Sequence, residues 1–452
     1  MSTEVHPATP KPQLSFRYGP HPADDLAWLA VFGDEKARSE ARAEIRREAS
    51  SRGILPASIL PLYEARGRGE VSGFTVPAIN IRALSYDTAR AAFRAGKSLS
   101  AGAVIFEIAR SEIGYTDQRP DEYAAVVLAA AIRERWDAPV FLQGDHFQTN
   151  AKKMKSDAAA EIRAIESLIL EAIAAGFFQI DIDTSTLVDL SRPTLDEQQR
   201  PNYDNCAHFT KFIRQHQPAG VEIAIGGEIG EVGKENSTPE EFRAYMQGYL
   251  GRLSGQIGIA KVSIQTGSSH GGQVAVDGSL KRMAVDFDAI RAISKIARED
   301  YGLAGAVQHG ASTLPEEDFG RFPEVDAAEI HLATGFQNLV YDHPAFPSAL
   351  RQTIYRWLTD NAADERKPGE SPEQFLYKSR KKAIGPFKAA FWNLPVGARE
   401  AIGESLEEKF HFFFEKLRVE TTRDMIGKYI RPVAFEASAH SGAFTRDDEA
   451  GD

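Results

Sequence analysis

The fold of this chain is decided by a repeating pattern that begins with FTVPAINIRALSYDTARAAFRAGKSLSAGAVIFEIAR, residues 74–110. A short apolar run, FTVPAINI, leads into the helix-forming segment SYDTARAAFRAG, and a second apolar run, AVIFEI, follows it. Short apolar runs separated by helical segments are typical of parallel strands joined by crossover helices. The stretch therefore predicts one β-α-β unit.

The same alternation recurs until eight strands are counted, at residues 74–81, 103–108, 139–142, 178–183, 222–228, 260–265, 305–308 and 327–332. Near-continuous apolar strands favour a parallel sheet covered by helices. Eight such units close a (β/α)₈ barrel, here of about 290 residues. An open doubly wound sheet is the alternative, but neither GxGxxG nor GxxxxGK[ST] follows the first strand.

Three regions of the chain are expected. Residues 1–70 form an N-terminal arm with capping helices, one of them the charged segment 34–52. Residues 71–358 form the barrel, and residues 359–452 form a C-terminal helical extension. The segment 407–430, EEKFHFFFEKLRVETTRDMIGKYI, is expected to be a helix whose phenylalanines pack on the barrel or on a partner subunit.

Composition excludes several classes of function. The 452 residues carry 53 Lys+Arg against 64 Asp+Glu, a net charge of −11, and no cluster of cations suits nucleic acid or an anionic membrane. No apolar run approaches the roughly 18 residues of a membrane span, and residues 1–13 lack the apolar core of a signal peptide. A single cysteine, Cys206, cannot form an internal disulfide. We expect a cytoplasmic protein.

Histidines and carboxylates collect where the expected strands end, and in a barrel these ends meet at one mouth. Four of the eleven histidines, His146, His270, His309 and His331, follow or end different strands. Three neutral imidazoles beside an open position suit a catalytic Zn²⁺, with Mn²⁺ or Mg²⁺ as alternatives. The other polar residues at these ends include Asn80, Ser111, Asp145, Glu228 and Glu231.

Two glycine-rich segments predict an anion site beside the histidines. GSSHGG at 267–272 contains Gly271, and HGAST at 309–313 contains Gly310 and Ser312. Thr334 comes just after the eighth strand. Barrels often bind phosphate through backbone N–H groups near strands seven and eight.

Six segments, taken in order, resemble the class II, metal-dependent ketose-bisphosphate aldolases. They are GDH (144–146), IDIDTST (180–186), GGEIGEVGKEN (226–236), TGSSHGG (266–272), QHGAST (308–313) and IHLATGFQN (330–338). The resemblance covers roughly residues 70–345 and implies a barrel enzyme that cleaves a ketose bisphosphate by a retro-aldol reaction.

The resemblance also implies roles for individual residues. His146, His270 and His309 match the metal ligands, and Glu228 matches a carboxylate that holds the metal in an alternative position. Asp145 matches the group that exchanges a proton with the substrate hydroxyl, and Glu235, or Glu231 in its place, matches a second acid/base. The phosphate-loop positions are matched by Gly271, Gly310, Ser312 and Thr334.

The chain departs from this pattern where the eighth strand ends. His331 stands where the family has an asparagine that contacts the substrate backbone, and Ala311 replaces a glycine. The leading hypothesis is an aldolase acting on a sugar phosphate, and we expect a homo-oligomer. The alternatives are a metal-dependent sugar or hexuronate epimerase, which uses the same bond cleavage, and a non-catalytic partner subunit of an aldolase.

Overall fold

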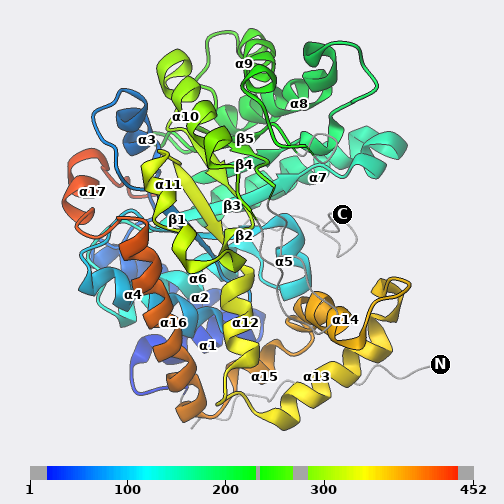
Figure 1. Cartoon of the computed structure of the whole chain (residues 1–452). Helices are drawn as coiled ribbons and strands as arrows, with labels where there is room; N and C mark the ends of the chain where they lie inside the picture. Colours follow the sequence, from blue (N-terminus) through cyan, green and yellow to red (C-terminus); the bar gives the residue numbers. More distant parts are fainter. Residues whose placement is uncertain (1–17, 231–234, 268–283, 436–452) are drawn as a thin grey trace.

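The computed structural model describes residues 18–230, 235–267 and 284–435, and a closed barrel of parallel strands lies at its centre. Each strand pairs with the next one along the chain, and β8 pairs with β1 to close the barrel (Figure 1). The predicted (β/α)₈ barrel is confirmed. The strands are β1 Val76–Asn80, β2 Ile105–Ala109, β3 Phe141–Gln148, β4 Gln179–Asp183, β5 Ala224–Glu228, β6 Lys261–Ile264, β7 Ala306–Gln308 and β8 Glu329–Leu332.

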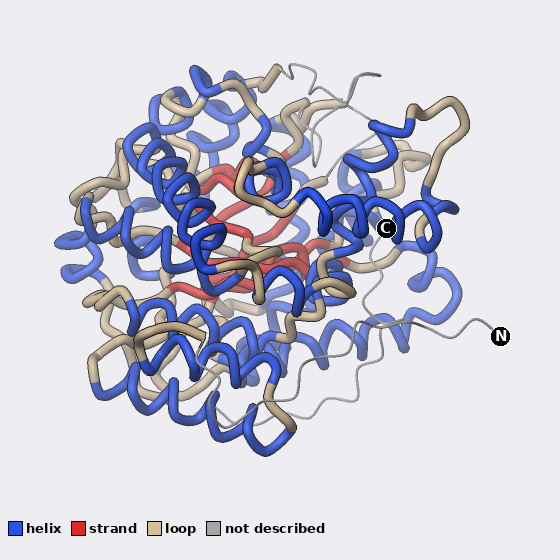
Figure 2. Tube along the Cα trace, turned by 90° about the horizontal axis from the view of Figure 1, so that it is seen from below, coloured by secondary structure: helices blue, strands red, loops and turns tan. Residues whose placement is uncertain are grey.

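Helices surround the strands in both views of the chain (Figure 1, Figure 2). Those that precede the barrel are α1 Pro22–Phe32, α2 Glu35–Ser51 and α3 Leu60–Gly67. Those that alternate with the strands or follow β8 are α4 Ser85–Ser98, α5 Arg110–Thr116, α6 Pro120–Arg133, α7 Ala151–Ala175, α8 Leu195–His216, α9 Pro239–Leu253, α10 Phe287–Tyr301, α11 Arg321–Glu324, α12 Thr334–Asp342 and α13 Ser348–Asn361. The C-terminal ones are α14 Pro372–Ser379, α15 Lys388–Trp392, α16 Val396–Lys416 and α17 Arg423–Tyr429.

The barrel interior is polar, which differs from the near-continuous apolar strands expected from the sequence. Lys261 on β6 donates hydrogen bonds to Gln143 on β3, at 2.8 Å, and to Asp181 on β4, at 2.9 Å, and it also pairs with Glu329 on β8. Strand β6 is not a neighbour of β3, β4 or β8, so the side chains meet inside the barrel. The residues between them, such as Ile180 and Val262, face the helices and are fully buried. The strands are therefore polar inward and apolar outward.

A glycine makes room for this interior network. A Cβ at Gly226 on β5 would lie 2.3 Å from an oxygen of Asp181 and 3.0 Å from Cε of Lys261. Any larger residue would displace the lysine or the aspartate. The absence of a side chain on β5 thus permits the contact between β4 and β6.

The segment 407–430, predicted from the sequence to be one helix, is divided between the end of α16 and α17. Phe410, Phe413 and Phe414 of α16 are buried. Arg418 and Thr421 then adopt left-handed backbone conformations, with φ of 58° and 64°. Backbone hydrogen bonds from Thr75 to the carbonyl of Leu417 and from Thr421 to that of Leu99 tie this break to the barrel. These tertiary bonds replace those of a continuous helix.

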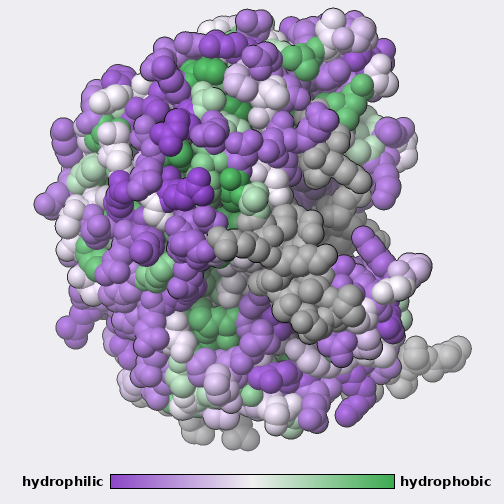
Figure 3. Space-filling view, in the orientation of Figure 1, coloured by the Kyte–Doolittle hydropathy of each residue, from purple (hydrophilic) through white to green (hydrophobic). Residues whose placement is uncertain are grey.

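The visible face of the molecule is mainly hydrophilic, with hydrophobic residues scattered between polar ones (Figure 3). The exposed large hydrophobic residues of the described chain are Leu190, Leu250, Ile257 and Val396. Among the helices of the described ranges, none combines the length and the apolar character that crossing a membrane requires.

Candidate functional site

A β-bulge in β3 delivers two consecutive residues to the barrel mouth. The pairing with β4 runs from Gly144 opposite Ile180 to Phe147 opposite Ile182, so two residues of β3, Asp145 and His146, face one of β4. His146 has a left-handed backbone with φ of 39°. In a regular strand these two side chains would point to opposite faces. The bulge turns both toward the mouth, and β3 extends to Gln148, beyond the predicted end at residue 142.

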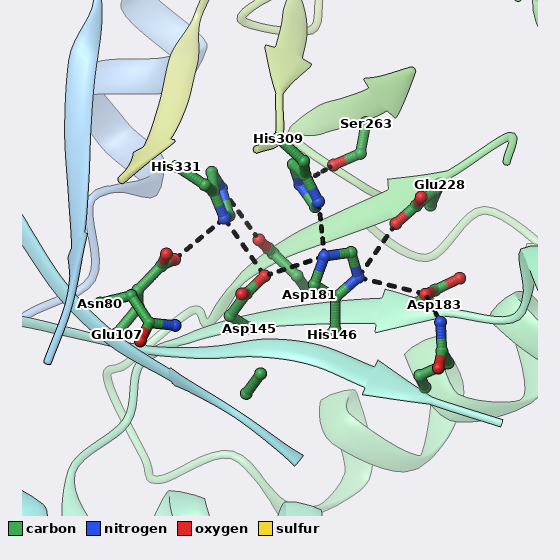
Figure 4. Close-up of polar contacts among 12 residues, drawn as sticks. Asn80, Glu107, Asp145, His146, Asp181, Asp183, Glu228, Ser263, His309 and His331 are labelled. Carbon is green, nitrogen blue, oxygen red and sulfur yellow. Dashed lines mark hydrogen bonds and ion pairs between the residues drawn. The ribbon is translucent and has the colours of Figure 1, made fainter. Parts of the chain in front are cut away.

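His146, His309 and Glu228 form the outer cluster of the mouth (Figure 4). Nε2 of His146 lies 2.5 Å from Nδ1 of His309, and the two rings are nearly perpendicular, with centroids 4.2 Å apart. Nδ1 of His146 lies 3.3 Å from Glu228 and 3.1 Å from Asp183. Ser263 on β6 holds His309 from the other side, with Oγ 2.9 Å from Nε2.

The electrostatics of this outer cluster are dominated by carboxylates. Burial raises the pKa of Glu228 to about 7, and Asp183 adds to the rise. Burial would lower the pKa of His146, but Asp145, Glu228 and Asp183 together raise it well above the ordinary value for histidine. The cluster therefore stabilises positive charge.

The donor set of the outer cluster fits a divalent metal ion. One candidate ligand atom each from His146, Glu228 and His309 lies within 4.8 Å of the other two. Two imidazole nitrogens that face each other at 2.5 Å cannot both carry hydrogens. A pair of imidazoles with one carboxylate is a set that Zn²⁺ and related ions prefer.

His331 lies beside His309 and belongs to a second, more buried cluster. Its ring stacks on that of His309, with centroids 4.2 Å apart. Nδ1 lies 3.0 Å from Glu107 and 3.2 Å from Asp145, and Nε2 lies 2.7 Å from Glu329. The candidate substrate residue on β8 thus contacts carboxylates from three strands.

The second cluster also carries excess negative charge. Burial raises the pKa of Glu107 to about 7, with Asp145 contributing, and raises that of Asp181 to about 6. Burial would raise the pKa of Glu329 as well, but Lys261 and His331 lower it to about 2. Glu329 is therefore the carboxylate of this cluster that stays ionised most readily.

The residues expected to bind an anion lie where β7 and β8 end. Gly310 has a left-handed backbone with φ of 66°. The Ser312 hydroxyl accepts a hydrogen bond from the backbone N–H of Gly335, at 2.9 Å, which links the loop after β7 to the first turn of α12. Arg82, just beyond β1, donates to the hydroxyl of Thr334 at 3.3 Å. This arginine also pairs with Glu112 at 2.6 Å.

The other predicted site residues are placed less centrally or lie outside the described chain. Asn80 is buried at the end of β1, and its amide donates to Glu112 at 2.5 Å. Ser111 is half-buried in the first turn of α5. Glu235 is exposed. His270, Gly271 and Glu231 lie outside the described residues.

The site prediction from sequence assigned no role to the residues that support the clusters from inside the barrel. Asp181 and Asp183 are recognisable from the sequence as polar residues at the end of the fourth strand. The residues missed altogether are Gln179 on β4, Lys261 and Ser263 on β6, and Glu329 on β8 beside His331. Their signal was polar residues at a spacing of two within apolar strands, which places them on one face.

Comparison with known proteins gives one family match. The family model for fructose-bisphosphate aldolase class-II matches residues 67–391. No curated protein sequence matches the chain.

Solved structures with a similar fold have low sequence identity. A probable tagatose 6 phosphate kinase from Sinorhizobium meliloti 1021 is 16% identical, with a TM-score of 0.51 over 78% of this chain and 99% of that one. A fructose-bisphosphate aldolase from Campylobacter jejuni is 17% identical (TM-score 0.48; 80% and 94% covered). The fructuronate-tagaturonate epimerase UxaE from Cohnella laeviribosi is 12% identical (TM-score 0.49; 79% and 82% covered). At these sequence identities, the similarity to the solved structures concerns the fold alone.

Proposed function

The chain belongs to the class II fructose-bisphosphate aldolase family, and from this premise we propose that it is a metal-dependent lyase that cleaves or forms a carbon–carbon bond in a ketose phosphate. The observation that carries the proposal is the meeting of His146, His309 and Glu228 beside Asp145 at one barrel mouth. A proton-transfer group next to a metal-binding set is what retro-aldol cleavage requires.

The metal ion of the proposed enzyme would be held by His146, His309 and Glu228, with His270 as a further ligand. Zn²⁺ suits this set, and Mn²⁺ or Mg²⁺ are the alternatives. When bound, the ion supplies Lewis-acid stabilisation of the negative charge that develops on the ketone oxygen during cleavage.

Asp145 would take the proton from the substrate hydroxyl at the bond that breaks. Its carboxylate lies 3.2 Å from Nδ1 of His331 and 3.8 Å from Nε2 of His146, so it is held between the two clusters. A fixed carboxylate needs little reorientation before proton transfer. Glu235 or Glu231 would protonate the carbon that is left after cleavage.

The anionic end of the substrate would bind between β7 and β8. Gly310, Ser312 and Thr334 would provide backbone and hydroxyl donors there, and Arg82, which also pairs with Glu112, would add a guanidinium donor beside Thr334. Such local donors are needed because the net charge of −11 repels a phosphate ester from the molecule as a whole. Asn80 and Ser111 would contact the substrate from the β1 and β2 side.

The test is turnover of a panel of ketose mono- and bisphosphates by the purified chain with added Zn²⁺, Mn²⁺ or Mg²⁺. The expected products are two shorter fragments, detected as triose phosphate in a coupled assay. The variant His309→Ala is expected to lose both metal and turnover, while His208→Asn, which changes a histidine on the outer helix α8, should keep both. A metal-loaded chain that cleaves none of these substrates would refute the lyase proposal.

A second candidate is an epimerase that breaks the same bond and re-forms it on the other face. His331 favours this candidate, because it stands where the family resemblance implies a substrate-binding asparagine and it is tied instead to Glu107 and Glu329. The same panel, extended to hexuronates and followed by ¹³C NMR, separates the two. An epimerase returns a product with all its carbons and one inverted centre.

A further inference from the structure

We propose that the barrel mouth binds a second divalent cation, held by His331, Glu107 and Asp145 on the more buried side of the His146–His309–Glu228 set. The family resemblance assigns no metal ligand to His331 or to Glu107. The proposal does not depend on which reaction the protein catalyses, because it stands on the contacts of His331.

The hydrogen bonds of His331 leave one ring nitrogen facing two carboxylates (Figure 4). Nε2 lies 2.7 Å from Glu329, whose carboxylate is also bound by Lys261, so Nε2 carries the hydrogen and donates it. Nδ1 then directs its lone pair toward Glu107, at 3.0 Å, and Asp145, at 3.2 Å. A lone pair and two carboxylates repel each other unless a metal ion or a proton lies among them.

The pairing of His331 with Glu329 is the arrangement that histidines adopt when they bind metals. A metal-binding imidazole typically donates its second nitrogen to a carboxylate, which fixes the tautomer and makes the free nitrogen more basic. Glu329 is well placed for this supporting role, because Gln143 donates to it at 2.8 Å and Tyr63 donates to its other oxygen. Its oxygens are already committed to these donors, and Glu107 and Asp145 are the carboxylates that face Nδ1 of His331.

Buried oxygens without donors are the second observation that points to a ligand. Within residues 18–230, 235–267 and 284–435, Oε1 of Glu107 and Oδ1 of Asn80 have no hydrogen-bond partner, although Glu107 is fully buried and Asn80 is 2% exposed. The two residues are paired across β1 and β2, so they point to the same inward face. An unpartnered buried carboxylate oxygen is costly, and a cation beside it would remove that cost.

Carboxylates at the mouth also outnumber the lysines and arginines that pair with them among the described residues. Six buried or nearly buried carboxylates gather there, from Glu107, Asp145, Asp181, Asp183, Glu228 and Glu329. Of the lysines and arginines in the described residues, only Lys261 forms ion pairs with these carboxylates, namely with Asp181 and Glu329. With all six carboxylates ionised, three negative charges remain after Lys261 and one divalent ion are counted. In that state a second divalent ion leaves one negative charge, whereas a proton on His331 leaves two.

The chemistry of the donors suggests the kind of ion. One imidazole and two carboxylates suit Mn²⁺, Zn²⁺ or a similar first-row divalent ion. Ca²⁺ prefers a site made only of oxygen ligands, so this donor set suits it less well. Asp145 lies between the two sets, 3.8 Å from His146 and 3.2 Å from His331. The two ions would therefore lie on either side of Asp145.

The experiment is a count of Mn²⁺ bound to the full chain after chelator treatment, by equilibrium dialysis and elemental analysis. We expect two ions per wild-type chain, one in His331→Asn, which restores the residue that the family resemblance implies, and one in Glu107→Gln. His146→Ala should keep the second ion, and His208→Asn, which changes another histidine paired with a glutamate, should keep two. Spin coupling between the ions in the EPR spectrum should appear in wild type and be lost in His331→Asn.

One bound ion in wild type, with the same affinity in His331→Asn, would overturn the proposal and leave His331 as a protonated histidine between carboxylates. If His331→Asn does not fold, as judged by circular dichroism, Glu107→Gln decides. An anomalous difference map from crystals soaked in Mn²⁺ should show a peak between His331 and Glu107, and a peak at the outer set alone would also overturn it. Two ions without turnover would refute the proposed function and not this site.

Discussion

Ser263 shows how a single hydroxyl prepares a metal ligand. Its Oγ lies 2.9 Å from Nε2 of His309, so Nδ1 is the nitrogen turned toward His146. Groups that orient a metal-binding histidine typically contribute 10- to 100-fold to metal affinity.

Ser263→Ala is therefore expected to weaken Zn²⁺ binding by about 10- to 100-fold without unfolding the chain. Competition with a chelating dye measures the dissociation constant. Ser98→Ala is the matched control, because Ser98 makes a similar contact with His411, at 3.1 Å, on the outer surface. Equal Zn²⁺ affinity in Ser263→Ala and wild type would contradict the role given to Ser263.

Among the elements, α16 anchors the C-terminal extension through its aromatic face. The Phe413 ring lies 4.8 Å from that of Phe319 and 5.7 Å from that of Phe336, centroid to centroid, and it is 1% exposed. Phe412, its neighbour, is only half-buried.

Phe413→Ala is expected to lower the free energy of unfolding by about 3–5 kcal/mol, because it leaves a cavity between α16 and the barrel. Phe412→Ala should cost clearly less. Urea denaturation followed by circular dichroism measures both. Similar losses for the two variants would show that α16 does not dock through Phe413.

Ion pairs connect helix α2 to helix α6. Arg42 lies 2.9 Å from Asp121, and Arg46 pairs with the same carboxylate. Burial alone would raise the pKa of Asp121, but Arg46 and Arg42 outweigh it and lower that pKa. The stabilisation is therefore present above the unfolded pKa of about 3.9 and is lost as pH falls through the lower folded value.

Asp121→Asn is expected to reduce the free energy of unfolding by about 1 kcal/mol at pH 7, because the carboxylate is partly exposed to water. The difference from wild type should shrink as pH falls below about 4. Denaturation from pH 7 to pH 3 tests this, with Glu40→Gln, from an exposed pair on α2, as the control. A difference that grows on acidification would contradict the assignment.

At the scale of the whole molecule, Lys261 joins opposite walls of the barrel. It is 1% exposed and contacts side chains from β3, β4 and β8. Burial would lower its pKa, but Asp181 and Glu329 raise it, so the lysine is charged.

Lys261→Met is expected to cost about 3–5 kcal/mol in the free energy of unfolding, because removing one partner leaves buried carboxylates uncompensated. Lys36→Met, at an exposed lysine of α2, should have little effect. Both are measured by denaturant unfolding at pH 7. A Lys261→Met variant as stable as wild type would mean that Asp181 and Glu329 share protons instead of relying on the lysine.

The sequence by itself determined the barrel, its eight strands and the gathering of histidines at strand ends, because these depend on local periodicity and on the fact that parallel strands end at one mouth. It also predicted that His146, His309 and Glu228 lie at the same barrel mouth, although His146 is inside β3 and not beyond its end. It did not reveal the bulge in β3, because a bulge is defined by pairing with β4 and not by residue type.

Only the tertiary structure decided which polar residues act together. Lys261 is 80 residues from Asp181 and 68 residues from Glu329 along the chain. Each of the three lies in a strand whose local sequence is otherwise mainly apolar. Closing the barrel brings them into a low-dielectric interior, where an unpaired charge is costly and a paired one holds its neighbours in place. For the same reason His331, which the sequence presents as a substituted asparagine, acquires its two carboxylate neighbours only when β8 closes against β1.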